Sequence, residues 1–159
     1  MPHRIQFLRT LDGLDYFNDS KSTSPSATIV ALESFDRAIV AIVGGQKKDV
    51  RLTDFAEALI RSCRAVVYTG ESGSAFAEAV RNAAATATGT RPTVMNTAVG
   101  RLTHPLVHRA DRMEDAVRLA QHEAQPDDVL LFSPGAPSFD SYSNFAQRGD
   151  HFMKCVLRL

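Results

Sequence analysis

The sequence predicts an α/β domain: a Rossmann-like, mostly parallel sheet with helices on both faces and an N-terminal antiparallel hairpin strand. Three observations predict this class. Short apolar runs typical of buried strands alternate with segments of helical periodicity. Turn residues separate them at the spacing of strand–helix units. The first segment instead carries an Asp-Gly turn between two alternating runs, which is typical of a β-hairpin.

Length and composition favour one compact globular domain. The chain has 159 residues, 44% of them hydrophobic, which suffices for one core but not for two full domains. Its 18 basic and 18 acidic residues cancel, which argues against nucleic acid or a membrane surface as partner. No apolar run approaches the roughly 18 residues of a membrane span. The N-terminus lacks a signal-like stretch, and two cysteines without a CxxC pair fit a reducing compartment, so we expect a cytoplasmic protein.

The first part of the chain reads as a hairpin, a helix and a buried strand. The hairpin is expected over residues 4–17, with Asp12-Gly13 at its turn. Ser24 is the expected N-cap of the helix, with Pro25 at the first helical position. The uniformly apolar run 38–43 suits the middle of a covered sheet.

The strand–helix unit then recurs. Thr53 is the expected N-cap of one helix, and Ser72 or Ser74 that of the next. A stretch rich in Thr, Gly and Ala over 86–103 predicts a long loop, typical of an insertion or a functional flap. The remaining expected elements are a helix carrying 55–60, strand 65–69, helix 75–84, strand 106–109, helix 113–120, a turn at 126–128, strand 129–132 and helix 144–156.

Three short polar segments follow expected strands, at the edge where open α/β sheets bind their ligands. They are residues 18–23, 44–48 and 133–138, and we expect them to converge on one rim. Plainer explanations also exist for single segments. Gly44-Gly45 can simply end a strand, and Asp19 with Ser20 can simply make a turn.

The side chains of these segments suit an anionic ligand. Lys21 and Lys48 offer ammonium groups to carboxylates or phosphates. Thr23 and Ser138 offer hydroxyl groups, and Asp19 can accept hydrogen bonds from sugar hydroxyls or help to hold a metal-bound water. The sequence therefore predicts an anion-binding rim.

Several common motifs are absent from the sequence. It has no GxxxxGKS/T phosphate loop, no GxGxxG and no GxSxG, which argues against a complete P-loop ATPase, a dinucleotide dehydrogenase and a hydrolase. His104 and His108 are four residues apart, but Pro105 between them disfavours the helix that would pair them as metal ligands. No Cys or carboxylate cluster completes a zinc set, so no metal ligands are expected. Arg4 is either a solvated charge or a residue that reaches back to the rim.

Five ordered stretches resemble the C-terminal domain of the Mur ligases, and together they span nearly the whole chain. They are Pro2-His3-Arg4, residues 18–23, residues 44–48, Leu131-Phe132-Ser133-Pro134 and residues 138–150. Ligases of this family that add later residues carry an Asp-Tyr-Ala-His type motif where this chain has Asn18-Asp19-Ser20-Lys21. This difference favours the branch that adds D-glutamate.

The resemblance implies an ATP-dependent ligase as the full-length protein. Such an enzyme joins the carboxylate of UDP-N-acetylmuramoyl-L-alanine to the amine of D-glutamate, through an acyl phosphate and a tetrahedral intermediate, and releases ADP and phosphate. Residues 1–159 would be its C-terminal, amino-acid-binding domain. The UDP-binding domain and the central ATPase domain, which would bind most of the ATP and magnesium, are not in this chain. We therefore expect the chain alone to be inactive.

The resemblance also implies roles for individual residues. Arg4 and Asp19 would contact the nucleotide, Asp19 at the ribose. Lys21 would lie near the reacting centre, and Lys21 and Lys48 are the candidate catalytic residues. The implied D-glutamate-binding residues are Thr23, Lys48, Ser138, Phe139 and Phe145. These types suit the ligand, because a lysine and hydroxyls bind a dicarboxylate and an apolar wall strengthens those bonds.

Two other interpretations remain open. The chain could be a stand-alone module that binds a nucleotide or an acidic amino acid without catalysis. It could also be the equivalent domain of another Mur-type or folate-polyglutamate ligase. Gly135-Ala136-Pro137 stands where the family commonly has Ala-Cys-Ala, within the segment expected to form the glutamate pocket.

Overall fold

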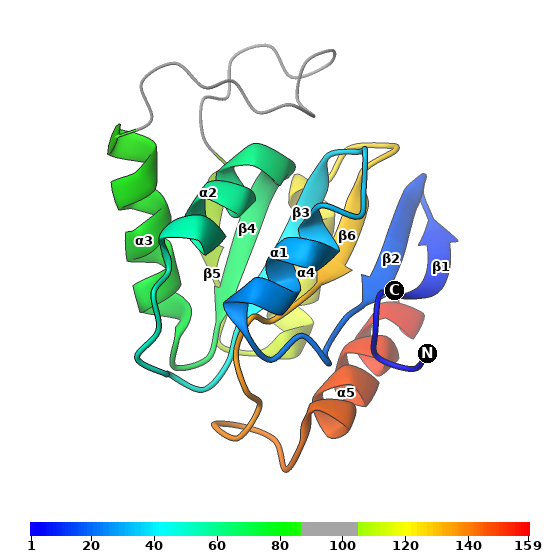
Figure 1. The fold of residues 1–159 in the computed structure, drawn as a ribbon. Coiled ribbons are helices and arrows are strands. Elements are labelled where there is room, and N and C mark those ends of the chain that lie inside the picture. The colour runs from blue at the N-terminus through cyan, green and yellow to red at the C-terminus, as the bar shows by residue number, and fades with distance from the viewer. Residues whose placement is uncertain (87–104) are drawn as a thin grey trace.

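The computed structural model describes residues 1–86 and 105–159, which form one sheet and the helices that cover it (Figure 1). The long loop expected over 86–103 lies, apart from Thr86, outside the described residues. The elements are β1 (Gln6–Leu11), β2 (Leu14–Asn18), α1 (Pro25–Leu32), β3 (Ile39–Gly44), α2 (Thr53–Ser62), β4 (Cys63–Thr69), α3 (Gly73–Thr86), β5 (Leu106–Arg109), α4 (Met113–Glu123), β6 (Val129–Phe132) and α5 (Phe145–Leu157).

The sheet has six strands in the order β1-β2-β6-β3-β4-β5. Only β1 and β2 are antiparallel, and every other neighbouring pair is parallel. The hairpin turn uses Asp12 and Gly13, both at positive φ, as a tight two-residue turn requires. The predicted fold class is confirmed, including the antiparallel strand at the N-terminal end.

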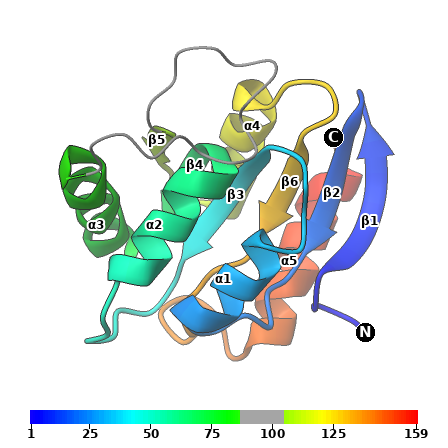
Figure 2. The same ribbon diagram turned by 45° about the horizontal axis from the view of Figure 1, so that its top comes forward.

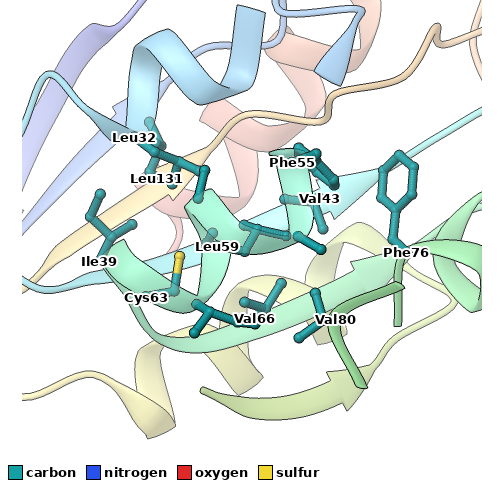
Figure 3. Close-up of a cluster of buried hydrophobic side chains, with 14 of the residues drawn as sticks. Leu32, Ile39, Val43, Phe55, Leu59, Cys63, Val66, Phe76, Val80 and Leu131 are labelled. Atoms are coloured by element: carbon teal, nitrogen blue, oxygen red, sulfur yellow. The ribbon is translucent and has the colours of Figure 1, made fainter. Parts of the chain in front are cut away.

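Helices cover both faces of this sheet, and each face has its own apolar cluster (Figure 2). Successive residues of a strand point to opposite faces, so Ile39, Ala41 and Val43 join the cluster under α1, α2 and α3. Val40 and Ile42 join the cluster under α4 and α5. Figure 3 shows the first cluster, which includes side chains of α1, α2 and α3 with those of the strands.

Several expected boundaries differ from the structure. Thr53 is not an N-cap but the first residue of α2, and its preceding residue Leu52 makes no capping bond. Helix α2 passes directly into β4 at Cys63, because Cys63 pairs with Ile39 of β3 and extends the strand toward the helix. Helices α3 and α4 run beyond the predicted ends. Ser24 caps α1 as expected, and its side chain accepts a hydrogen bond from the Ala27 amide.

None of the helices in the described part of the chain has the length and apolar character needed to cross a bilayer.

Candidate functional site

The carboxyl ends of β2, β6 and β3 meet at one edge of the sheet, and the segment that follows each strand lies there. Backbone hydrogen bonds join the segments: Asp19 N–H to the Phe132 carbonyl at 2.7 Å, Gly44 N–H to the Pro134 carbonyl at 2.7 Å, Gly135 N–H to the Ser22 carbonyl at 3.0 Å, and Gln46 N–H to the Pro137 carbonyl at 2.8 Å. Residues 18–23, 44–48 and 133–138 therefore converge on one rim, as the sequence predicts.

Thr23 and Lys48 line the same cavity at this rim, although they are far apart in the sequence. Ser72 and Phe76, at the start of α3, form part of its wall, together with the 135–137 segment. Its volume is about 140 Å³, roughly that of five water molecules. A cavity of this size suits an amino acid better than a nucleotide, and it presents a cation, a hydroxyl and an aromatic ring.

Lys21 and Phe145 form a second group on the rim. The Lys21 ammonium lies 5.9 Å from the centroid of the Phe145 ring, within range of a cation–π interaction. The His3 ring meets Phe145 edge-on at 6.2 Å, and the Lys21 amide donates to the His3 carbonyl. Lys21 is exposed, and its ammonium group also lies 3.5 Å from the Met1 sulfur. Phe145 begins α5 and is not among the residues lining the cavity of Thr23 and Lys48.

The Asp19 carboxylate is buried and is held by internal hydrogen bonds. One oxygen accepts from the Ile5 amide at 3.1 Å, and the other accepts from the Ser133 hydroxyl at 2.7 Å. Each carboxylate oxygen has a second lone pair, so these bonds leave acceptor capacity for a ligand. In the structure, Asp19 ties the residues before β1 to the segment after β6.

The remaining predicted site residues differ in exposure. Ser138 is buried, and its carbonyl accepts from the Ser141 and Tyr142 amides in a turn. Phe139 is 67% exposed on the same segment, unlike most large apolar side chains of this protein. Arg4 is exposed, and among the described residues its guanidinium makes no hydrogen bond or ion pair. The structure therefore does not bring Ser138, Phe139 and Arg4 into the Thr23–Lys48 cavity.

Arg148 of α5 joins segments of the rim, although sequence reasoning assigned it only a place in a family-like stretch. Its guanidinium donates to the Ser20 hydroxyl and carbonyl and to the Ala136 carbonyl, at 2.9–3.1 Å. Burial lowers the pKa of Arg148 to about 10, so the group stays protonated at neutral pH. Arg148 thus fixes two of the three rim segments to α5. This role is visible only in the structure, where the buried guanidinium meets carbonyl groups that are distant in the sequence.

Gly45 of the rim is joined to Ser72, just before α3, by two hydrogen bonds that sequence reasoning missed. The Gly45 amide donates to the Ser72 hydroxyl at 2.9 Å, and the Ser72 amide donates back to the Gly45 carbonyl at 2.9 Å. A Cβ at position 45 would collide with the Pro137 carbonyl and lie 2.9 Å from the Arg148 guanidinium. Only glycine fits there, so the pair Gly44-Gly45 does more than end a strand.

The donor chemistry of this rim suits anions better than a magnesium ion. Mg²⁺ takes carboxylate and water oxygens. The rim offers the ammonium groups of Lys21 and Lys48, hydroxyls, and one carboxylate, Asp19, whose two oxygens already accept internal bonds. These residues do not by themselves fit a magnesium site. They fit the carboxylate or phosphate groups of a bound substrate.

An open α/β sheet with polar segments gathered at its carboxyl edge defines the class of domain that binds ligands at that edge. Residues 3–135 match the family described as Mur ligase, glutamate ligase domain, and the chain belongs to that family. The resemblance seen in the sequence is thereby confirmed.

Curated relatives of this chain include two enzymes named UDP-N-acetylmuramoylalanine–D-glutamate ligase. The protein of Salinibacter ruber is 40% identical over 156 residues, which cover 98% of this chain and 30% of the relative. The protein of Pelotomaculum thermopropionicum is 36% identical over 157 residues, which cover 99% of this chain and 30% of the relative. The chain therefore spans about 30% of the length of these relatives.

Solved structures show the same fold at low sequence identity. The UDP-N-acetylmuramate-alanine ligase MurC of Thermotoga maritima superposes with a TM-score of 0.57 at 11% identity, over 99% of this chain and 30% of that one. The folylpolyglutamate synthase of Mycobacterium tuberculosis superposes with a TM-score of 0.56 at 16% identity, over 96% of this chain and 32% of that one. At these identities the likeness shows the fold alone.

Proposed function

We propose that this chain is the amino-acid-binding, C-terminal domain of an ATP-dependent ligase that adds D-glutamate to UDP-N-acetylmuramoyl-L-alanine. The observation that carries the proposal is the cavity that Thr23 and Lys48 share. An ammonium group and a hydroxyl beside an aromatic wall are the groups that bind an acidic amino acid in a partly desolvated site. The 40% identical relative is named for this reaction.

In this proposal the domain contributes by positioning D-glutamate. Lys48 and Thr23 bind its carboxylates, and Ser138, Phe139 and Phe145 complete the pocket when the domain closes on its partners. The amine is thereby held against an acyl phosphate and attacks its carbonyl carbon. The resulting tetrahedral intermediate loses the amine proton to solvent and expels phosphate, which leaves the amide. Such orientation supplies about 7–11 kcal/mol of the barrier reduction in well-aligned reactions. No residue of this chain needs to form a covalent bond.

The proposal gives the nucleotide the N-terminal part of the rim, which adjoins the D-glutamate pocket at Phe145. Lys21 is exposed beside Phe145, where its charge can meet the phosphate leaving group. Arg4 and Asp19 lie on the same N-terminal side, because the Ile5 amide binds Asp19. ATP, magnesium and the UDP-linked substrate would be held mainly by domains outside this chain. The chain alone is then expected to be inactive, and its cytoplasmic location stays a prediction.

Replacement of Lys48 tests the pocket assignment. In the full-length ligase that carries this domain, Lys48→Ala should raise the KM for D-glutamate at least tenfold, because a hydrogen bond to a charged group is worth about 1.5–3 kcal/mol. The KM for ATP should change little. Lys47→Ala is the matched control, since Lys47 is the adjacent exposed lysine and does not line the cavity. Equal KM values for D-glutamate in the two variants would refute the assignment.

The alternatives predict different results for simple measurements. A stand-alone binding module predicts that calorimetry of the chain detects ATP, ADP or D-glutamate at micromolar affinity, and that the native polypeptide has this length. A ligase domain predicts a native product about three times as long. A panel of amino-acid and folate substrates on the full-length protein separates the D-glutamate ligase from other Mur-type and folate-polyglutamate ligases.

A further inference from the structure

A cluster of metal-ligating side chains lies on the α4–α5 face of the sheet, away from the cavity of Thr23 and Lys48. Glu114 comes from the first turn of α4, and His151 and Cys155 come from α5. One ligand atom of each lies within 4.8 Å of the other two. The sequence hides this cluster, because Glu114 is 37 residues from His151 and no local motif joins them.

The spacing within the cluster suits a single ion. His151 and Cys155 are four residues apart and so face the same side of α5. The Glu114 carboxylate lies 3.2 Å from His151 Nε2, close to the roughly 3.3 Å that separates two ligands of a tetrahedral ion at bond lengths near 2.0 Å. The Cys155 sulfur lies within 4.8 Å of the other two ligand atoms. On binding it would move to about 3.6 Å from each, the separation that a bond to sulfur near 2.3 Å requires.

Tyr142 fixes the orientation of the imidazole. Its hydroxyl lies 2.8 Å from His151 Nδ1, which leaves Nε2 facing Glu114. Metal-binding histidines almost always use their second ring nitrogen for such a hydrogen bond, which sets the tautomer and the ring plane. With a metal ion on Nε2, the Nδ1–H group would donate to the Tyr142 hydroxyl, which is the outer hydrogen bond of such a site.

Two of the three side chains, Glu114 and His151, are reached from a cavity, whereas Cys155 is buried and does not line it. Glu114, Tyr142 and His151 line a cavity of about 290 Å³ that reaches Gly44 and Gly70 at the carboxyl edge of the sheet. An ion held by three protein ligands keeps a fourth position for water or another small ligand. Here that position would face the cavity.

We propose that Glu114, His151 and Cys155 bind a divalent transition-metal ion of the zinc class, with Tyr142 as the hydrogen-bond partner of the ligating imidazole. One oxygen, one nitrogen and one sulfur ligand suit zinc or cobalt and do not suit magnesium or calcium, which take oxygen ligands. The Cys155 thiol releases its proton to solvent as its sulfur binds the ion. The bound ion joins α4 to α5.

Cobalt titration of the 159-residue chain tests the site, because a thiolate bound to Co²⁺ gives an intense near-ultraviolet charge-transfer band. The band should appear at one equivalent and should be abolished in Cys155→Ser. Zinc should displace the cobalt. Glu114→Gln and His151→Ala should each weaken zinc binding at least tenfold, and Tyr142→Phe about 10–100-fold.

His108→Ala is the matched control. The His108 imidazole lies 3.2 Å from the Glu123 carboxylate, the same separation as in the His151–Glu114 pair, and neither residue belongs to the cluster that includes Cys155. This variant should bind zinc like the unmodified chain. No charge-transfer band in the unmodified chain, or equal zinc affinity in it and in Glu114→Gln, would overturn the proposal and leave Glu114–His151 as an ion pair between two helices. Circular dichroism of each variant confirms that it is folded.

Discussion

At the scale of single residues, the rim depends on a few side chains and backbone angles that no substitute reproduces. Asp19 accepts two internal bonds, Arg148 donates three, and both are almost fully buried. Gly44 adopts a φ of +118°, and a Cβ there would collide with the Thr69 carbonyl of the neighbouring strand. The rim is thus shaped before any ligand arrives.

Gly44→Ala should lower the free energy of unfolding by more than about 2 kcal/mol, since a left-handed residue costs about 1–3 kcal/mol and the clash adds to this. Gly13→Ala is the control. Gly13 also has a positive φ, but a Cβ there would meet Pro126 at an ordinary 3.4 Å. Urea unfolding should show a loss near 1 kcal/mol for Gly13→Ala. Equal losses would mean that backbone angle alone, and not the close approach to β4, makes glycine necessary at position 44.

At the scale of elements, a buried ion pair joins the start of β4 to the turn before β6. Arg64 binds the Asp128 carboxylate through two nitrogens, at 2.6 and 3.0 Å, and Asp128 also accepts from the Gln125 amide. Both side chains are almost fully buried. The pair lies at the end of the sheet opposite the rim and aligns two strands that are separated by β3 in the sheet.

Asp128→Ala should lower the free energy of unfolding by about 3–5 kcal/mol, because it leaves the Arg64 guanidinium buried without its counter-charge. Glu33→Ala, which removes the exposed ion pair with Arg61 at 3.5 Å, should cost much less, since exposed pairs contribute about 0–1 kcal/mol. Chemical denaturation of both variants provides the comparison. Similar losses would show that burial of the Arg64 pair adds nothing to stability.

At the scale of the whole molecule, the two apolar clusters share the same strands and should therefore unfold together. Leu130 and Leu131 are adjacent in β6, both fully buried, and belong to opposite clusters. Tyr16 and Tyr68 also belong to opposite clusters, so tyrosine fluorescence follows the unfolding of both. Loss of one strand would therefore remove residues from both clusters.

Leu130→Ala and Leu131→Ala should each lower the free energy of unfolding by about 2–5 kcal/mol, as other buried leucines do when truncated. Each variant should keep a single unfolding transition, coincident by far-ultraviolet circular dichroism and tyrosine fluorescence. Two separate transitions in either variant would show that the faces are stabilised independently, contrary to the shared strands.

Much of the fold follows from local sequence patterns. The Asp12-Gly13 hairpin, the Ser24 cap and the strand at 129–132 were predictable because turn chemistry and apolar runs act over a few residues. The end of α2 was not, since no turn residue separates it from β4 and strand pairing decides where the helix stops. At the rim, the three polar segments were predictable from their place after strands. The resemblance grouped Thr23 and Lys48 with three further residues, and the sequence could not show that only these two of the five line one cavity.

The sequence by itself determined the fold class, the order of the elements and the segments that form the rim, because each depends on periodicity or spacing along the chain. The tertiary structure alone decided that β6 lies between β2 and β3 and that Arg148 ties the rim to α5. It also separated Thr23 and Lys48, which line one cavity, from the other three residues that the resemblance grouped with them. It alone brought Glu114 to His151 and Cys155. These relations join residues far apart in the chain, and only packing around the shared sheet brings such residues together.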